Sequence, residues 1–441
     1  MGRMTGLLDR VRAAVGALRR RSEPAPRPDP DTAGVPEMLG AVGTSMLAST
    51  QATNDVEDTL HQLSRAYDRP DLRTFVLPTL VLVEDPSTTP AHTAIFPAEG
   101  TSLRLDQAGG IERLIGRAVD TRMPPRDVVA EAARIRAAPP RFPVAVTILG
   151  HTILTLGFGM VLNPTATALP VYVVLGAIVG AIVVFGARVA TLSLLLPVFT
   201  AFAVTSLTAW LVVPFVDDDP LRLVAPALVS FLPGLTLTVA AVELTSSQVI
   251  AGASRMVYGV AQLGLLAFGV FGAITVVGIH VPAATPDTLG WWAPWVGIVL
   301  TSAGFALFSV APRGAIPWIL SALVVAYAAQ LAGNALLGAE LSGFVGAAAV
   351  VPAVHLVRRI RTAPPSAVML TCAYWLLVPG ALGFIGITEV AAGAAGALDT
   401  VVQTFVSLVA IAIGMMVGAG FSRDMTAVTR AWRHPPSKKR S

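Results

Sequence analysis

Charge is scarce in this chain, and that scarcity limits what the protein can be. Only 13% of the 441 residues are Asp, Glu, Lys or Arg, whereas soluble domains average about a quarter. Hydrophobic residues make up 54%, and the mean hydropathy is +0.69. We therefore expect an integral membrane protein. Seven of the ten glutamates precede residue 142, so a polar first third is followed by an apolar remainder.

Cysteine and lysine are almost absent. The single cysteine, Cys372, excludes an internal disulfide and a cysteine-based metal cage. Both lysines, Lys438 and Lys439, lie at the extreme C-terminus, so the chain has no GxxxxGK[ST] phosphate loop and cannot hydrolyse ATP by that route. We expect no metal and no cofactor. The net charge of +4 would suit nucleic acid, but the basic residues gather in membrane loops, so we expect no nucleic-acid partner.

The first 36 residues differ from those that follow. Apolar residues recur at helical spacing, and arginines occupy the other positions around the turns. This pattern predicts a basic amphipathic helix on an anionic membrane surface. The Pro-rich sequence SEPAPRPDPDTAGVP then predicts a linker.

Residues 37–140 predict a small cytoplasmic α+β domain. Its pattern favours helices over 38–66, 107–120 and 125–137, and strands within 72–85 and 92–99. A hydrolytic site could be assembled on paper from His61, Asp85, Ser87 and His92. Because no known motif spacing connects these residues, scattered surface polar residues are the favoured interpretation.

Ten apolar segments follow Pro143, each near the ~20 residues that a helix needs to cross a bilayer. They span 144–163, 169–187, 189–213, 223–243, 256–279, 292–311, 315–333, 340–357, 366–387 and 398–420. We therefore expect a polytopic α-helical membrane protein with about ten transmembrane helices.

Basic residues in the loops predict the orientation. If the N-terminal domain is cytoplasmic, Arg222 is the one basic residue of the outer loops. The inner loops and the basic tail, 423–441, then contain Arg188, Arg255, Arg313, Arg358, Arg359, Arg361, Arg423, Arg430, Arg433, Lys438, Lys439 and Arg440. Cytoplasmic loops are enriched in Lys and Arg, so we expect both termini in the cytoplasm.

Two Pro-Gly pairs, each followed by a glutamate, predict an internal repeat. FLPGLTLTVAAVEL contains Pro233, Gly234 and Glu243, and LVPGALGFIGITEV contains Pro379, Gly380 and Glu389, all 146 positions later. The same offset places the starts of the first five segments within five residues of those of the last five. We therefore expect five-helix halves at 141–285 and 286–422. Since five is odd, the second half is inverted, an arrangement typical of secondary transporters.

The repeated residues are the candidate substrate or proton site. Proline breaks a helix, glycine lets backbone and substrate approach, and an intramembrane carboxylate is a functional candidate by default. The interfacial alternative, glutamates lying in water at helix ends, remains open. His151 is a candidate for proton relay, Arg255 could pair with Glu243 or hold a substrate carboxylate, and Gln262 could hydrogen-bond substrate or another helix.

The segments RFPVAVTILGHTILTLGFGMVLNPT and FLPGLTLTVAAVELTSSQVIAGASRM, followed by a weaker second half with LVPG, resemble the threonine/serine exporter (ThrE-like) family over roughly residues 37–420. The resemblance implies proton-motive export of small hydroxy amino acids through the plasma membrane, and not an enzyme. The alternatives are export of a succinate-type dicarboxylate and a membrane-anchored hydrolase. The expected partners are an amino acid and membrane lipid; the oligomeric state stays open, a homo-oligomer included.

Overall fold

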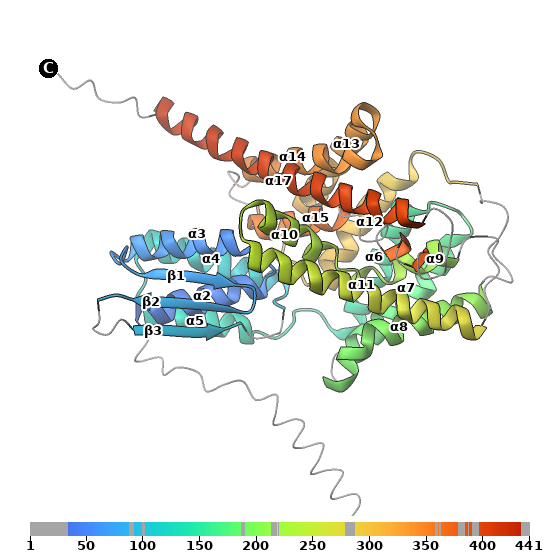
Figure 1. Cartoon of the computed structure of the whole chain (residues 1–441), viewed down its shortest axis with the longest axis horizontal. Coiled ribbons are helices and arrows are strands. Elements are labelled where there is room, and N and C mark those ends of the chain that lie inside the picture. Colours follow the sequence, from blue (N-terminus) through green and yellow to red (C-terminus); the bar gives the residue numbers. More distant parts are fainter. Residues whose placement is uncertain are drawn as a thin grey trace, which may run out of the picture.

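A helical bundle and a small α+β domain make up the protein in the computed structural model (Figure 1). The residues described are 34–87, 92–98, 102–186, 190–212, 218, 220–277, 287–357, 360, 363–377, 384–386, 388–389 and 397–433. The amphipathic helix predicted near the N-terminus lies outside them, as do Pro379 and Gly380.

The N-terminal domain packs four helices against a three-stranded antiparallel sheet of order β1-β2-β3. Its elements are α2 (Val35–Ala48), α3 (Thr53–Ala66), β1 (Arg73–Leu77), β2 (Leu80–Asp85), β3 (His92–Pro97), α4 (Leu105–Thr121) and α5 (Pro125–Ala137). Alternate strand residues Val76, Val81 and Val83 are buried in a core with Met38 and Leu60, as expected for a sheet covered on one face.

The predicted extent of one helix in this domain is wrong. The apolar pattern over 38–66 predicted a single helix, but the structure divides it into α2 and α3. The chain reverses between them, where Thr50 adopts a left-handed φ of 59°. Both halves carry apolar residues at helical spacing, so the pattern continued across a turn that lacks glycine and proline.

The bundle contains six helices that are long and apolar enough to cross a membrane, or up to seven if one bent pair forms a single span, among the residues described. The six are α6 (Val144–Leu162), α7 (Ala168–Gly186), α11 (Val249–Val277), α13 (Ile316–Leu337), α14 (Ala339–Val357) and residues 401–422 of α17 (Ala397–Arg433). The bent pair joins α9 (Pro220–Ala227) to the segment ending with α10 (Gly234–Thr245). Shorter apolar segments lie in α8 (Ala190–Leu211), α12 (Ala293–Phe308) and α15 (Ser366–Leu377).

Glycines bring α6 and α12 into close antiparallel contact. A Cβ on Gly150 would lie 2.6 Å from the backbone nitrogen of Phe308, and one on Gly157 would lie 2.7 Å from the carbonyl oxygen of Gly297. Gly304 faces the Leu154 backbone in the same way. The early part of α6 therefore meets the late part of α12. The small residues let the two backbones touch, as they do in many membrane helix pairs.

A second pair of contacts recurs at a similar offset. In α11, a Cβ on Gly269 would lie 2.4 Å from the carbonyl oxygen of Val198 in α8. In α17, a Cβ on Gly414 would lie 2.3 Å from the carbonyl oxygen of Phe344 in α14. Val198 and Phe344 are 146 positions apart, as are Pro233 and Pro379.

The loops at the two ends of the α6–α12 pair make matching contacts. The segment before α12 joins the loop after α6, where the Leu289 N–H donates to the Pro164 oxygen at 2.7 Å and Thr288 bridges to Thr165. The segment before α6 joins the loop after α12, where the Arg141 guanidinium donates to the Ala311 oxygen at 3.0 Å. The loops thus connect α6 and α12 at both ends of this helix pair.

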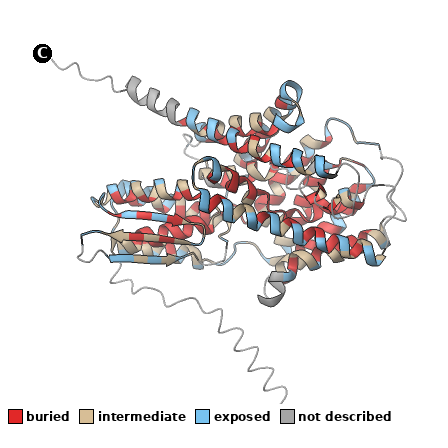
Figure 2. Ribbon diagram, in the orientation of Figure 1, coloured by how far each residue is buried: buried red, intermediate tan, exposed pale blue. Residues whose placement is uncertain are grey.

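Many of the exposed residues on the outer surface of the bundle, which Figure 2 marks by exposure, are large and apolar. Trp210, Ile250, Phe268 and Val276 are each at least two-thirds exposed. Large apolar side chains at this density are unfavourable in water and favourable in lipid, which agrees with a multi-pass membrane protein.

Candidate functional site

The fourth apolar segment is broken between Ala227 and Gly234, next to the predicted Pro233–Gly234 pair. Helix α9 and the segment from Val229 to Thr245 meet at 63°. A single 3-10 turn, η2 (Val229–Phe231), lies between α9 and α10, and Pro233 follows it as the N-cap of α10. Proline has no N–H to continue the helix, so the carbonyls of the preceding turn need other partners.

Ser230, in the turn between the two helices, meets His151. The His151 Nε2 atom lies 3.1 Å from the Ser230 hydroxyl, and its Nδ1 lies 2.9 Å from the carbonyl oxygen of Gly176 in α7. Because a carbonyl can only accept, Nδ1 carries the proton, and in the neutral ring Nε2 accepts from Ser230. Ser230 therefore keeps its oxygen lone pairs available at the break.

Gln262 supplies a partner for the broken backbone. Its side-chain Nε2 donates to the carbonyl oxygen of Phe231 at 2.9 Å. In a continuous helix this oxygen would accept from the backbone N–H of Leu235, four residues later. His151 from α6, Gln262 from α11 and the Pro233–Gly234 break thus come together, so the structure brings four of the sequence candidates to one place.

The first turn of α10 adds further polar groups. The first N–H groups of a helix have no intrahelical partner and carry partial positive charge. Thr238, about one turn into α10, is fully buried, and its hydroxyl has no hydrogen-bond partner in the described part of the chain. The side chains named at the break are neutral, so it offers helix N–H groups, a carbonyl and hydroxyls.

Glu243 lies at the other end of α10, where it contacts the N-terminal domain. It is completely buried, and its Oε1 accepts from the backbone N–H of Thr53 at 2.9 Å. Thr53 is the first residue of α3, so the carboxylate lies at the positive end of that helix. Its Oε2 is 3.1 Å from Arg255 Nε, close enough for an ion pair although the atoms are not aligned for a hydrogen bond.

Two more contacts hold the same junction. Arg255 donates to the carbonyl oxygen of Gln51 at 3.2 Å, and the Gln248 side chain donates to Glu57 at 3.2 Å. The predicted pairing of Arg255 with Glu243 is therefore present. In this conformation the Glu243 carboxylate contacts protein groups on both oxygens, which leaves the substrate-binding role assigned to it as a prediction.

Glu389, the counterpart of Glu243 in the sequence, has a different environment. It is helical and only partly buried. Since Pro379 and Gly380 lie outside the described residues, the second Pro-Gly break cannot be compared with the first.

Two polar residues of the bundle escaped sequence analysis. Ser230 is a single serine in an apolar run, and its position three residues before Pro233 was the one signal that could have identified it as a site residue. Asp218 is buried and accepts from Thr165 at 2.8 Å and from Asn163 at 3.2 Å. Its position in the run Asp217–Asp219 suggested solvent, because runs of like charge are usually hydrated.

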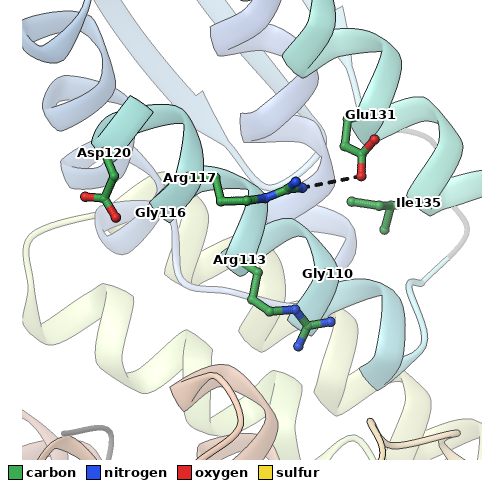
Figure 3. Close-up of a pocket in the computed structure, with 7 residues that line it drawn as sticks. All are labelled: Gly110, Arg113, Gly116, Arg117, Asp120, Glu131 and Ile135. Carbon is green, nitrogen blue, oxygen red and sulfur yellow. Dashed lines mark hydrogen bonds and ion pairs between the residues drawn. The ribbon is translucent and has the colours of Figure 1, made fainter. Parts of the chain in front are cut away.

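The N-terminal domain has a groove of about 430 Å³ between α4 and α5 (Figure 3). Arg117 reaches across it to Glu131 at 3.4 Å. The described residues that line it include two carboxylates, Asp120 and Glu131, and no serine, cysteine or histidine. Elsewhere in the domain, hydrogen bonds from Ser87 and an ion pair with Arg69 lower the pKa of Asp85 to about 2.

The comparison with protein families gives one match. The model of the family ThrE, described as "Putative threonine/serine exporter", matches residues 37–277. These residues include the N-terminal domain, the break and Glu243, and make up more than half of the chain. No curated protein matches the chain. No solved structure matches it either.

Proposed function

We propose that this chain, which belongs to the threonine/serine exporter family, is a secondary transporter that exports threonine and serine, driven by the proton-motive force. Its substrate binds at the break between α9 and α10. The break carries this proposal, because it gathers His151, Ser230 and Gln262 around an interrupted helix inside an apolar bundle.

The chemistry of the break suits a zwitterion with a hydroxyl group. The N-terminal turn of α10 would bind the carboxylate of the amino acid, as helix N-termini bind anions. The Ser230 oxygen would accept from the ammonium group, and the unpartnered Thr238 hydroxyl would bind the side-chain hydroxyl. A dicarboxylate would bring two negative charges to neutral side chains, so the environment favours the amino acid.

The transport mechanism in this proposal is rocking of two inverted halves, 141–285 and 286–422. The antiparallel α6–α12 pair supports it, since Gly150 and Gly157 precede Gly297 and Gly304 by the same 147 positions. Equivalent helices that run in opposite directions are what an inverted repeat requires. The matching contacts of the flanking loops give further support.

We assign the N-terminal domain and both termini to the cytoplasmic side of the plasma membrane, as the arginine-rich loops favour. Glu389, which is only partly buried, is then the acid that exchanges protons near the outer side. Glu243, already bonded to Thr53 and Arg255, becomes available only after a conformational change.

Efflux of labelled threonine from proteoliposomes tests the proposal. Ser230→Ala should lower efflux about tenfold or more, since a binding hydrogen bond of about 1.5 kcal/mol is lost. Ser302→Ala is the control, because Ser302 is a buried serine that donates within α12, to Val299.

The outcome separates substrate classes. Wild-type protein should release threonine and serine, and excess succinate should not compete. Competition by succinate with little threonine efflux would replace the proposal with dicarboxylate export. Equal efflux from the Ser230→Ala and Ser302→Ala variants would exclude the break as the binding site.

A further inference from the structure

The N-terminal domain contacts the bundle at two docks of different construction. The α10–α11 dock joins Glu243, Gln248 and Arg255 of the bundle to residues 51–57 of the domain. The three hydrogen bonds named here each involve a bundle side chain. The dock covers the inner end of α10, about 14 Å along the helix from the break.

The α12–α15 dock is built mainly from backbone and apolar contacts. The N–H groups of Leu105 and Asp106 donate to the carbonyl oxygens of Ser309 and Val310, each at 3.1 Å. Leu105 is buried in one cluster with Phe305 of α12 and Val368 of α15.

Two further contacts of this dock use α4. Gly109 packs against the loop after α12, where an added Cβ would lie 3.4 Å from Pro312. Glu112 accepts from the Ser366 hydroxyl at 3.2 Å. The α12–α15 dock thus surrounds the N-terminal half of α4.

Opening the α10–α11 dock and opening the α12–α15 dock would cost different amounts of free energy. If the α10–α11 dock opens, Glu243 and Arg255 both stay on the bundle and still neutralise one another, so no buried charge loses its partner. The freed Thr53 N–H and Gln51 carbonyl can be hydrated. If the α12–α15 dock opens, Leu105 and the apolar residues around it become exposed to water. This exposure costs about 25 cal/mol of free energy for each Å² of apolar surface.

We propose that the N-terminal domain is a gate over the inner end of α10, which opens at the α10–α11 dock and remains attached at the α12–α15 dock during each transport cycle. Opening exposes Glu243 and the inner end of α10 to the cytoplasm. This proposal rests on the proposed transport function. It gives the domain a role that needs no catalytic residues.

Paired cysteines test the gate, because each dock has one pair of side chains within hydrogen-bond distance. Full-length protein with Cys372→Ala receives either Glu57→Cys with Gln248→Cys, or Glu112→Cys with Ser366→Cys. The first pair crosses the α10–α11 dock at 3.2 Å, and the second crosses the α12–α15 dock at 3.2 Å. A short, reducible thiol-reactive crosslinker joins each pair, and single-cysteine variants control for modification alone.

Crosslinking 57 to 248 should lower threonine efflux at least about tenfold, as expected when a required opening step is blocked, and reduction should restore it. Crosslinking 112 to 366 should leave efflux within about twofold of the unlinked protein, because that dock stays closed. Undiminished efflux after the first crosslink would overturn the gate, and so would loss of efflux after the second.

A second measurement separates failure of the gate from failure of the transport proposal. If the unlinked variants release no threonine, the transport proposal fails, and hydrogen exchange then tests the gate alone. In wild-type protein, the Thr53 amide should exchange at least about tenfold faster than the Leu105 and Asp106 amides, because dock opening releases it. Equal protection of the three amides would overturn the gate whatever the substrate.

Discussion

The break and Glu243, about 14 Å apart along α10, differ in their chemistry. At the break, neutral side chains satisfy an interrupted backbone and leave hydroxyl groups available. At the other end, Glu243 forms a buried ion pair with Arg255 of α11 and accepts from the Thr53 N–H of the N-terminal domain. In the two proposals above, the break recognises the zwitterionic substrate, and the Glu243 end of the same helix controls access from the cytoplasm.

Arg255→Leu should have the largest effect on stability. It leaves Glu243 buried without its cation, which costs about 3–5 kcal/mol, so the protein should unfold at markedly lower temperature in detergent. Adding Glu243→Gln to this variant should recover much of the loss, because no unpaired charge remains. A single variant as stable as wild type would show that the pair contributes little at this end of α10.

Gln262→Leu should have the next largest effect, at the opposite end. Removal of the amide leaves the Phe231 carbonyl without its partner, at a cost of about 1–3 kcal/mol. We expect a lower melting temperature and weaker threonine efflux. Gln330→Leu, at a partly buried glutamine of α13, is the control; equal losses in both variants would argue against a special role for the break.

Thr53→Pro tests the α10–α11 dock with little change to α3. Proline is tolerated at the first position of a helix, and the preceding Ala52 has the extended backbone that proline requires (ψ 144°). The variant removes only the N–H that Glu243 accepts, so stability should fall by about 1.5–3 kcal/mol. Thr53→Ala keeps that N–H and should behave as wild type in thermal unfolding; the same loss in both variants would contradict the role of this hydrogen bond.

Asp85→Asn should have the smallest effect, far from both ends of α10. The pKa of Asp85 is lowered to about 2 in the folded protein, so its stabilisation is present above the unfolded pKa of about 4 and is lost as pH falls toward 2. Because the site is partly hydrated, the loss should stay below about 1 kcal/mol. Unfolding midpoints measured from pH 6 to pH 3 should converge for wild type and variant; a constant gap would exclude this titration as the cause.

Sequence analysis predicted the break and the pairing of Glu243 with Arg255, but not the contact between Glu243 and the N-terminal domain. Pro233 and Gly234 are local signals, because a proline removes a helical N–H wherever the rest of the chain lies. The bond of Glu243 to Thr53 depends on how two separate regions pack. A pattern within one segment contains no information about a partner 190 positions away.

The number of membrane helices illustrates the same limit. Ten segments of adequate hydropathy predicted ten spans, and six pass the length and composition test in the described chain, with one bent pair besides. Helix α12 is shorter than a full span, but it packs against α6 through Gly297 and Gly304. Hydropathy measures compatibility with lipid, whereas helix length is set by neighbouring helices and loops.

The most direct test of the central claim is whether threonine occupies the space beside the α9–α10 break. In Cys372→Ala protein, a cysteine at Thr238, which is buried near the break, is compared with one at Thr245, which is exposed on the same helix. Alkylation by a small water-soluble reagent is followed with and without threonine. Threonine should slow alkylation at position 238 but not at 245; equal rates at 238 with and without threonine would contradict binding at the break.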